Sequence, residues 1–262
     1  MRSSQAAFDL IIREEVSSKE IFDRKYRRPE WPGEASGPTV GIGYDLGQTD
    51  VATIRGDWKG RVSDAMLEAM LGCSGKTGGA GRAHTQAVRS LIDIPWAVAL
   101  DVHKERVMPR WEGRLAANLP NTNKLSGDCF GALLSLCFNR GIAFGKDGDR
   151  YKEMRAIKAH MAMQRFDLIP AEIRAMKRLW PEVKGLRDRR DREAALFEKG
   201  LKNPTGPIVA GGAGTVIVAG GAATTAKQQG LSDAATFGII FVGVVLAVVV
   251  TVAAIKVYRK KG

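Results

Sequence analysis

Cysteines are scarce in this sequence, and their spacing predicts no disulfide framework. Cys129 and Cys137 lie eight residues apart in an apolar run that is predicted to be helical. At ~1.5 Å per residue their separation is about 12 Å, which is too long for a disulfide bond. With Cys73 they are expected to be free, buried thiols. The three histidines lack the spacing of a metal-ligand set and are expected at or near the surface. We therefore expect no metal and no cofactor.

The first sixteen residues, "MRSSQAAFDLIIREEV", lack a long apolar run, because charged residues interrupt it from Asp9 onward. This pattern predicts no signal peptide. What the chain has in excess is positive charge: 40 basic against 28 acidic residues, a net charge of +12. Such a protein is attracted to polyanions, whether nucleic acid, anionic lipid or acidic wall polymer. A soluble basic protein without a charged partner is the alternative.

A change in composition at "KNPTGP", residues 202–207, marks the clearest domain boundary. Residues 1–203 have charges every few positions and form the predicted globular domain. Residues 204–233 read as a glycine-rich linker or a marginal second hydrophobic segment. Residues 234–255 then contain no charge. As a helix they would span about 33 Å, against a hydrocarbon core of ~30 Å.

We predict a transmembrane helix over 234–258 and a basic tail over 259–262. A buried strand pair is the alternative for this valine-rich run. The basic tail indicates a cytoplasmic C-terminus, so a single crossing puts the globular domain on the wall side. Insertion of 207–226 as a second span would keep both ends inside.

Within residues 1–203 the hydrophobic periodicity mostly predicts helices, and the fold class is therefore α+β, predominantly α. The run "CFGALLSLCFNRG" is apolar nearly all round, which predicts a buried central helix. Only 38–45 reads as a strand. The predicted helices cover 5–20, 63–71, 82–91, 95–107, 127–140, 151–165, 170–179 and 187–199.

The first helix carries the tandem glutamates of "LIIREEV". At 100° per residue, Glu15 falls on the apolar stripe with Ile11 and Ile12, whereas Glu14 falls off it. Burial raises the pKa of a carboxyl group, which suits a general acid working near neutral pH. A purely structural glutamate paired with a core arginine fits the spacing equally well.

The stretch "SGPTVGIGYDLG" combines a hydroxyl, two alternating glycines and a carboxylate. In a strand, Thr39, Gly41 and Gly43 share one face, which leaves room for a ligand to approach the backbone. Thr39 and Asp45 would be about 20 Å apart if fully extended. They serve one site only if the chain reverses near Gly43. A plain glycine-rich hairpin with Asp45 as a turn residue is the alternative.

Three motifs in order give the chain a resemblance to a known family. "EEVSSKEIFDRKYRRPEWPGEASGPTVGIGYDLG" resembles the N-terminal part of phage-type lysozymes, glycoside hydrolase family 24. "GALLSLCFNRG" is similar to that family's central helix, and "GLRDRRDREAALFEKG" to its closing Arg-Arg-x-x-Glu helix. The resemblance implies a lysozyme-like fold, with a small β-hairpin lobe and a helical lobe.

One spacing departs from the best-known members, in which the second carboxylate lies nine residues after the glutamate. Here that position is Arg24. The six-residue spacing of Thr39 and Asp45 resembles the pesticin-like branch instead. The resemblance therefore implies Glu15, Thr39 and Asp45 as the catalytic residues. The expected substrate-binding residues are Gly41, Gly43, Trp31 and Asn139.

The implied activity is that of an N-acetylmuramidase, which hydrolyses the β-1,4 bond between N-acetylmuramic acid and N-acetylglucosamine. Glu15 would protonate the leaving oxygen while Asp45 and Thr39 position a water. The expected partners are peptidoglycan strands and a lipid bilayer, with no nucleic acid and a monomeric state. The expected location is the bacterial inner membrane. Two alternatives remain: a holin-like protein that binds wall without cutting it, and a lytic transglycosylase.

Overall fold

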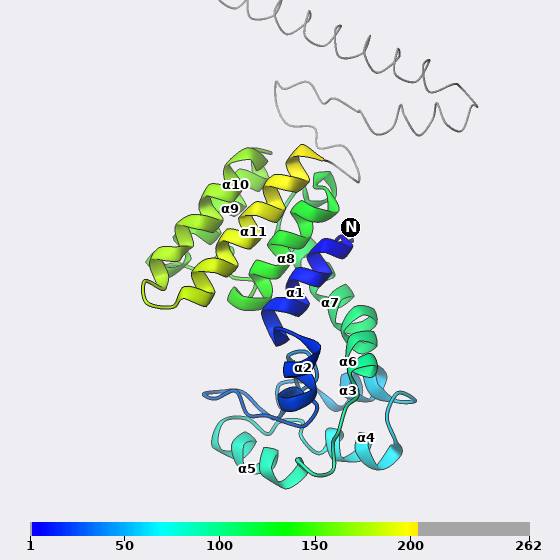
Figure 1. Cartoon of the computed structure of the whole chain (residues 1–262). Helices are drawn as coiled ribbons and strands as arrows, with labels where there is room; N and C mark the ends of the chain where they lie inside the picture. The colour runs from blue at the N-terminus through cyan, green and yellow to red at the C-terminus, as the bar shows by residue number, and fades with distance from the viewer. Residues whose placement is uncertain (1, 204–262) are drawn as a thin grey trace, which may run out of the picture.

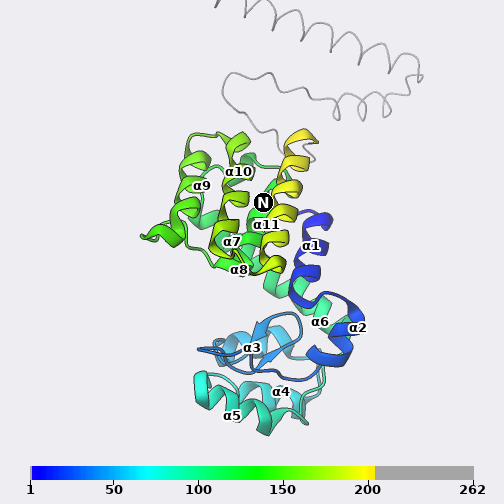
Figure 2. The same ribbon diagram turned by 60° about the vertical axis from the view of Figure 1, so that its left-hand side comes forward.

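A computed structural model describes residues 2–203 of the chain, which are predominantly helical with one two-stranded hairpin. Figures 1 and 2 show these residues as two lobes joined by a narrow waist. Each lobe has its own apolar core. The elements are α1 (Gln5–Val16), α2 (Lys19–Ile21), β1 (Thr39–Val40), β2 (Tyr44–Asp45), α3 (Val51–Trp58), α4 (Asp64–Leu71), α5 (Gly78–Val88), α6 (Trp96–Val102), α7 (Met108–Asn118), α8 (Gly127–Arg140), α9 (Lys152–Ala162), α10 (Ile169–Ala175) and α11 (Lys184–Lys202).

The upper lobe is built around α8, which is buried from Gly127 to Cys137. This confirms the predicted buried central helix. Ser126 caps its start by accepting a hydrogen bond from the Cys129 amide, and Gly141 ends it at φ 69°. A Cβ at Gly131 would lie 2.0 Å from the Ala7 Cβ, so α1 packs against the backbone of α8. Position 131 therefore tolerates only glycine, because any side chain there would push α1 away from α8.

The lower lobe contains α2 to α5 and the hairpin (Figure 1). Tyr44 on β2 is buried, packs edge-on against Trp58 and donates its hydroxyl to Asp57 over 2.7 Å. The Arg110 guanidinium of α7 donates to the same Asp57 carboxylate, also over 2.7 Å. The hairpin is thus tied both to α3 and to the helix that leads into the upper lobe.

Several boundaries differ from the predictions. The predicted helix 5–20 ends at Val16, because Ser17 has φ 64° and the chain restarts as α2. The predicted strand 38–45 is a hairpin, since residues 41–43 form its turn. Two helices were not predicted: α3, which contains Gly56, and α7, which contains Pro109 and Gly113. The glycines and the proline have low helix propensity, so the sequence pattern of both segments is not typical of a helix. The start signals are nevertheless present, because Asp50 caps α3 and Pro109 lies in the first turn of α7.

The three cysteines are free and buried, as predicted. Burial raises the pKa of the Cys73 thiol to about 12 and that of Cys129 to about 11. The predicted linker 204–233, transmembrane helix 234–258 and basic tail 259–262 lie outside the described residues. Within residues 2–203, no helix combines the length and apolar character that a membrane crossing requires.

Candidate functional site

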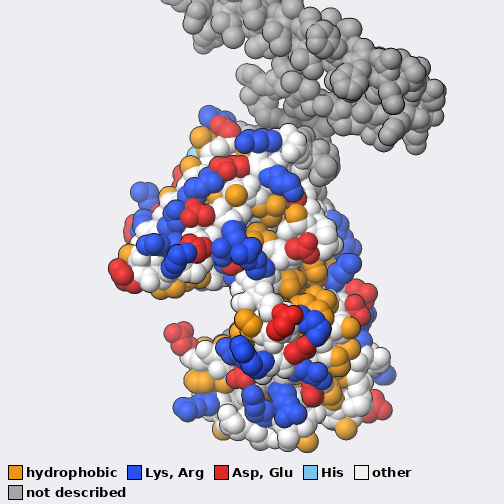
Figure 3. Space-filling view, viewed as in Figure 1, with side chains coloured by type: hydrophobic (Ala, Val, Ile, Leu, Met, Phe, Trp, Pro, Cys, Tyr) orange, Lys and Arg blue, Asp and Glu red, His pale blue; other side chains and the backbone are white. Residues whose placement is uncertain are grey.

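An open hollow separates the two lobes on one side of the molecule (Figure 3). In Figure 1 its upper border is formed by the lower ends of α8 and α11, and its lower border by the loop that precedes β1. Helix α1 runs down the upper lobe toward the waist (Figures 1 and 2), and Glu15 in its last turn lies next to Gly43 of the hairpin. The residues predicted to be catalytic come from these two elements.

Glu15 lies in the last turn of α1, and its side chain is 24% exposed. Its Oε1 accepts a hydrogen bond from the Arg189 guanidinium over 3.2 Å. Its Oε2 faces the hairpin, because a Cβ built on Gly43 would lie 3.5 Å from it. The two oxygens of this carboxylate are therefore divided: one is held by the upper lobe, and the other faces the lower lobe.

Arg189 is itself held by buried polar groups of the upper lobe. Its Nε lies 3.1 Å from Glu193 Oε1, and its Nη2 donates to the Ser135 carbonyl over 2.9 Å. Glu193 is fully buried and also accepts hydrogen bonds from the Ser135 hydroxyl and from Arg190. Burial raises the pKa of the Glu193 carboxyl group, although both arginines oppose this shift. The network orients Arg189, which in turn orients Glu15.

The burial of the two adjacent glutamates is the reverse of the prediction. The Glu14 side chain is only 8% exposed, less than that of Glu15, because Arg192 covers it with hydrogen bonds of 2.6 and 3.0 Å. The helical wheel places Glu14 off the apolar stripe, but α11 lies along that flank of α1. Both glutamates thus pair with arginines of α11, and Glu15 is the one that faces the hairpin.

The hairpin brings Thr39 and Asp45 together as direct cross-strand partners. Paired residues have Cα atoms about 5 Å apart and side chains on one face. The chain reverses at residues 41–43, where Gly41 and Gly43 have φ of 59° and 66°. Glycine adopts a positive φ without the steric cost that a Cβ would bring, which is why both positions favour glycine. Gly41 is buried against Ala99, whereas Gly43 is exposed.

Main-chain groups hold Asp45. Its two carboxylate oxygens lie 3.2 and 3.1 Å from the Gly37 amide, and Oδ1 also accepts from the Gln48 amide over 3.0 Å. The Thr39 hydroxyl donates to the Gly37 carbonyl over 3.2 Å. A Cβ at Gly37 would lie 2.4 Å from the Gly47 Cα, so the loop is closed backbone against backbone. The side chains of Thr39 and Asp45 therefore converge on one residue.

Gly43 connects the two sides of the hollow, which we call the upper wall (α1 with Glu15) and the lower wall (the hairpin with Thr39 and Asp45). It lies against Glu15 Oε2 and precedes Asp45 by two residues. The arrangement thus brings the Glu15 carboxylate next to the hairpin on which Thr39 and Asp45 are paired.

The remaining predicted site residues are less central. The Trp31 indole donates to the Ser36 carbonyl over 2.9 Å, and the Arg82 guanidinium lies 5.7 Å from its ring centre. Trp31 lies in the loop that precedes β1 and is half-buried rather than freely presented. Asn139 is exposed in the last turn of α8.

Two features were missed from the sequence. "RDRRDRE" is typical of a solvated helix face, yet Arg189, Arg190 and Glu193 are buried. Their spacing with Ala194 and Phe197, which are also buried, could have revealed them as one core-facing stripe. The second is His103, which was expected at or near the surface. It is 1% exposed at the waist, in a π-helical turn, His103–Val107, between α6 and α7.

His103 lies between rings of the upper lobe, 6.1 Å from Phe8 and 5.5 Å from Phe138. Neither ring nitrogen has a hydrogen-bond partner within the described residues. Burial lowers the pKa of His103 to about 4, although the neighbouring main chain of Ile42 acts in the opposite direction. The waist therefore contains a neutral imidazole at physiological pH.

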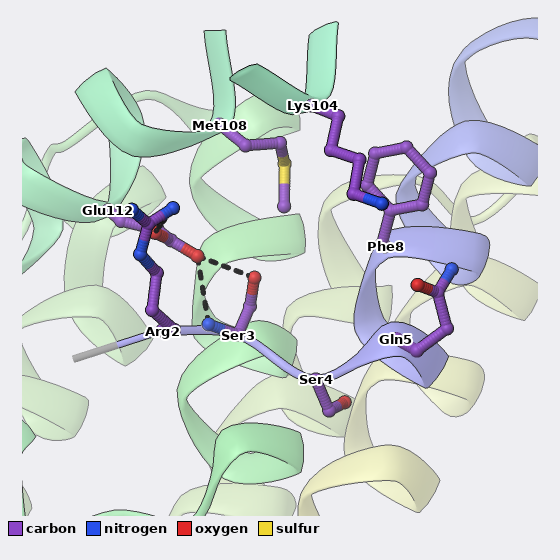
Figure 4. A pocket seen from close by; sticks show the side chains of 8 residues that line it. All are labelled: Arg2, Ser3, Ser4, Gln5, Phe8, Lys104, Met108 and Glu112. Carbon is purple, nitrogen blue, oxygen red and sulfur yellow. Dashed lines mark hydrogen bonds and ion pairs between the residues drawn. The ribbon is translucent and has the colours of Figure 1, made fainter. Parts of the chain in front are cut away.

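A separate small cavity of about 120 Å³ lies at the start of α1. Figure 4 shows Glu112 pointing at Ser3, from which it accepts two hydrogen bonds, of 2.8 Å from the amide and 2.6 Å from the hydroxyl. The Glu112 carboxylate thus anchors the N-terminal segment to α7. None of the residues that line this cavity belongs to the hairpin, and the cavity lies where the start of α1 packs near α7.

No protein-family model matches the chain, and no curated protein matches it.

Proposed function

We propose that this protein is an N-acetylmuramidase with a lysozyme-like arrangement of a helical lobe and a small hairpin lobe. The observation that supports it best is the meeting of Glu15 Oε2 with the hairpin that pairs Thr39 with Asp45. These residues come from chain segments more than twenty positions apart. An acid on one wall and a water-holding pair on the other is the constellation that glycoside hydrolysis requires.

In the proposed mechanism the glycan lies in the hollow between the lobes. Protonated Glu15 donates its proton to the glycosidic oxygen as the bond to the anomeric carbon breaks. Asp45 accepts a proton from a water that attacks that carbon from the opposite face, and the Thr39 hydroxyl orients this water. One water is consumed, one hydroxyl appears on each fragment, and the anomeric configuration inverts.

Arg189 and its network hold Oε1 of Glu15, and Oε2 faces Gly43 of the hairpin. This division of the carboxylate supports a role beyond a structural ion pair, because both oxygens of the neighbouring Glu14 bind Arg192. Glu14 therefore offers a matched control: an adjacent glutamate on the same helix with the same type of partner.

Incubation of the full-length protein with purified peptidoglycan tests the proposal. New reducing ends are expected from the wild type. Glu15→Gln should lower the rate by about 10²- to 10⁴-fold, the contribution typical of general acid catalysis, without unfolding the protein. Glu14→Gln should retain most of the activity. Equal activity of wild type and Glu15→Gln would refute the assignment, and unchanged wall with all three proteins would indicate a binder.

We further propose that residues 234–258 anchor the enzyme at the bacterial inner membrane, where it acts as a monomer on the wall. The support is the charge-free run 234–255 followed by the basic tail. Protease treatment of intact spheroplasts tests the topology. Cleavage of the N-terminal domain indicates one crossing, whereas full protection indicates that 207–226 also inserts.

A further inference from the structure

A second hollow, of about 270 Å³, lies on the lower lobe and is lined by charged side chains alone. Five of its lining residues are basic and two are acidic, so its net charge is positive. Figure 3 shows Lys and Arg side chains gathered around and below α2 on this face. The lining residues are Asp23, Arg24, Lys25, Arg27, Arg28, Arg89 and Asp93.

The floor of this basic pocket is fixed by hydrogen bonds across the chain. The Ile94 amide donates to the Arg27 carbonyl over 2.8 Å, and Arg27 Nε donates to Asp93 over 2.7 Å. Arg89 donates to the Pro29 carbonyl over 2.6 Å and to Glu30 over 2.8 Å. Two of the five basic side chains thus shape the pocket and are already neutralised by acids.

The other three basic side chains are available to a ligand. Arg24 and Lys25 are exposed, and neither forms an ion pair within residues 2–203. Arg28 is 54% exposed, and its nearest acid, Asp93, is 3.8 Å away. Three cations with unused hydrogen-bond donors therefore surround a concave space that is large enough for a small anion and its substituents.

We propose that this pocket binds a phosphate ester of a polyhydroxylated molecule, as it occurs in a polyol-phosphate polymer. Guanidinium and ammonium groups form charge-assisted hydrogen bonds with phosphate oxygens. The carboxylates of Asp23 and Asp93 accept hydrogen bonds from hydroxyl groups. No lining residue is aromatic or aliphatic, so the pocket offers no platform for stacking bases and no surface for acyl chains.

The pocket adjoins the back of the hairpin. The Gly41 amide donates to the Tyr26 carbonyl over 3.3 Å, and Glu30 pairs with Thr39 through two backbone hydrogen bonds. The segment between Tyr26 and Glu30 therefore joins the pocket to the lower wall of the hollow. An anionic wall polymer held there would lie beside the glycan-binding side, but binding itself does not depend on hydrolysis.

Isothermal titration calorimetry of the full-length protein with an oligomer of glycerol phosphate tests the proposal. Saturable binding that weakens with added salt is expected. The double variant R24Q/K25Q should weaken it at least about tenfold, because two charge-assisted contacts are lost. The double variant K152Q/K158Q removes the same charge from exposed positions of α9 and should leave the affinity unchanged.

Equal weakening by both double variants would overturn the proposal, because the effect would then be one of net charge. Binding of glycerol as tight as that of glycerol phosphate would also overturn it. Tighter binding of single-stranded DNA of the same phosphate count, or of phosphatidylglycerol vesicles, would assign the pocket to another partner. Glu15→Gln should bind the oligomer like the wild type. The binding result can therefore be interpreted even if the muramidase proposal fails.

Discussion

The two walls of the candidate site hold their carboxylates by opposite means. Glu15 in the upper lobe is positioned by side chains, through Arg189 and the buried Glu193. Asp45 in the lower lobe is positioned by main-chain amides of Gly37 and Gln48. Substitution of a supporting side chain should therefore disturb the upper wall, whereas the lower wall should respond to changes in backbone geometry.

The largest effect should come from Glu193→Ala, which removes the partner of two buried arginines. An uncompensated buried charge costs about 3–5 kcal/mol in the free energy of unfolding. Glu198→Ala is the control, because Glu198 pairs with Arg174 on the surface and should cost less than about 1 kcal/mol. Urea denaturation of both variants measures the difference. Similar losses would show that the network does not support the upper wall.

Acid should destabilise the waist between the two walls. The pKa of His103 is about 4 in the folded state, against ~6.5 when unfolded, so the unfolded chain binds more protons between these values. Stability contributed by the neutral imidazole is fully present above pH ~6.5 and is lost as the pH falls toward 4. The loss is about 3 kcal/mol at pH 4.

His103→Gln removes this titration, and its unfolding free energy should fall less steeply between pH ~6.5 and ~4 than that of the wild type. Denaturant unfolding at successive pH values measures the slopes. A wild-type slope in His103→Gln would contradict the account of the waist.

Asp45→Asn tests the lower wall directly. The introduced amide would keep one oxygen for the Gly37 and Gln48 amides but could not accept a proton from water. The rate of peptidoglycan hydrolysis should fall about 10²-fold, which corresponds to about 2.7 kcal/mol, with little change in stability. Reducing-end assays and thermal unfolding check the two parts. An active Asp45→Asn would remove this residue from the mechanism.

Gly37→Ala tests whether backbone packing holds Asp45. A Cβ there would lie 2.5 Å from the Lys76 carbonyl oxygen, so the loop must move at a cost of about 1–3 kcal/mol. Gly79→Ala on α5, with nothing within 4 Å, should be neutral or stabilising. Thermal unfolding compares the two. A neutral Gly37→Ala would show that the lower wall adapts to a side chain at this position.

Parts of this arrangement could be predicted from the sequence, and the limits have physical causes. The continuous apolar run of α8 was sufficient to identify it as the buried helix. The spacing of Thr39 and Asp45 required a chain reversal, which the hairpin provides. Helix α1 was predicted too long, because nothing in its pattern shows that Ser17 adopts positive φ.

The arginine network could not be predicted from charge patterning. Arg189 and Glu193 read as a surface pair at i and i+4, and only the packing of α11 on α8 and α1 shows that they are buried. For the same reason the helical wheel predicts that Glu15 is more buried than Glu14, whereas Glu14 is the less exposed of the two. A wheel describes one helix, whereas the exposure of Glu14 and Glu15 depends on the neighbouring helix.

The central claim is that the two walls form one hydrolytic site, and the products of peptidoglycan digestion test it most directly. Mass spectrometry of fragments released by the full-length protein should show muropeptides with reducible N-acetylmuramic acid ends, each one water heavier than an anhydro product. Glu15→Gln should release these fragments about 10²- to 10⁴-fold more slowly. Anhydro ends would indicate a transglycosylase, and intact wall after wild-type treatment would contradict the enzymatic account altogether.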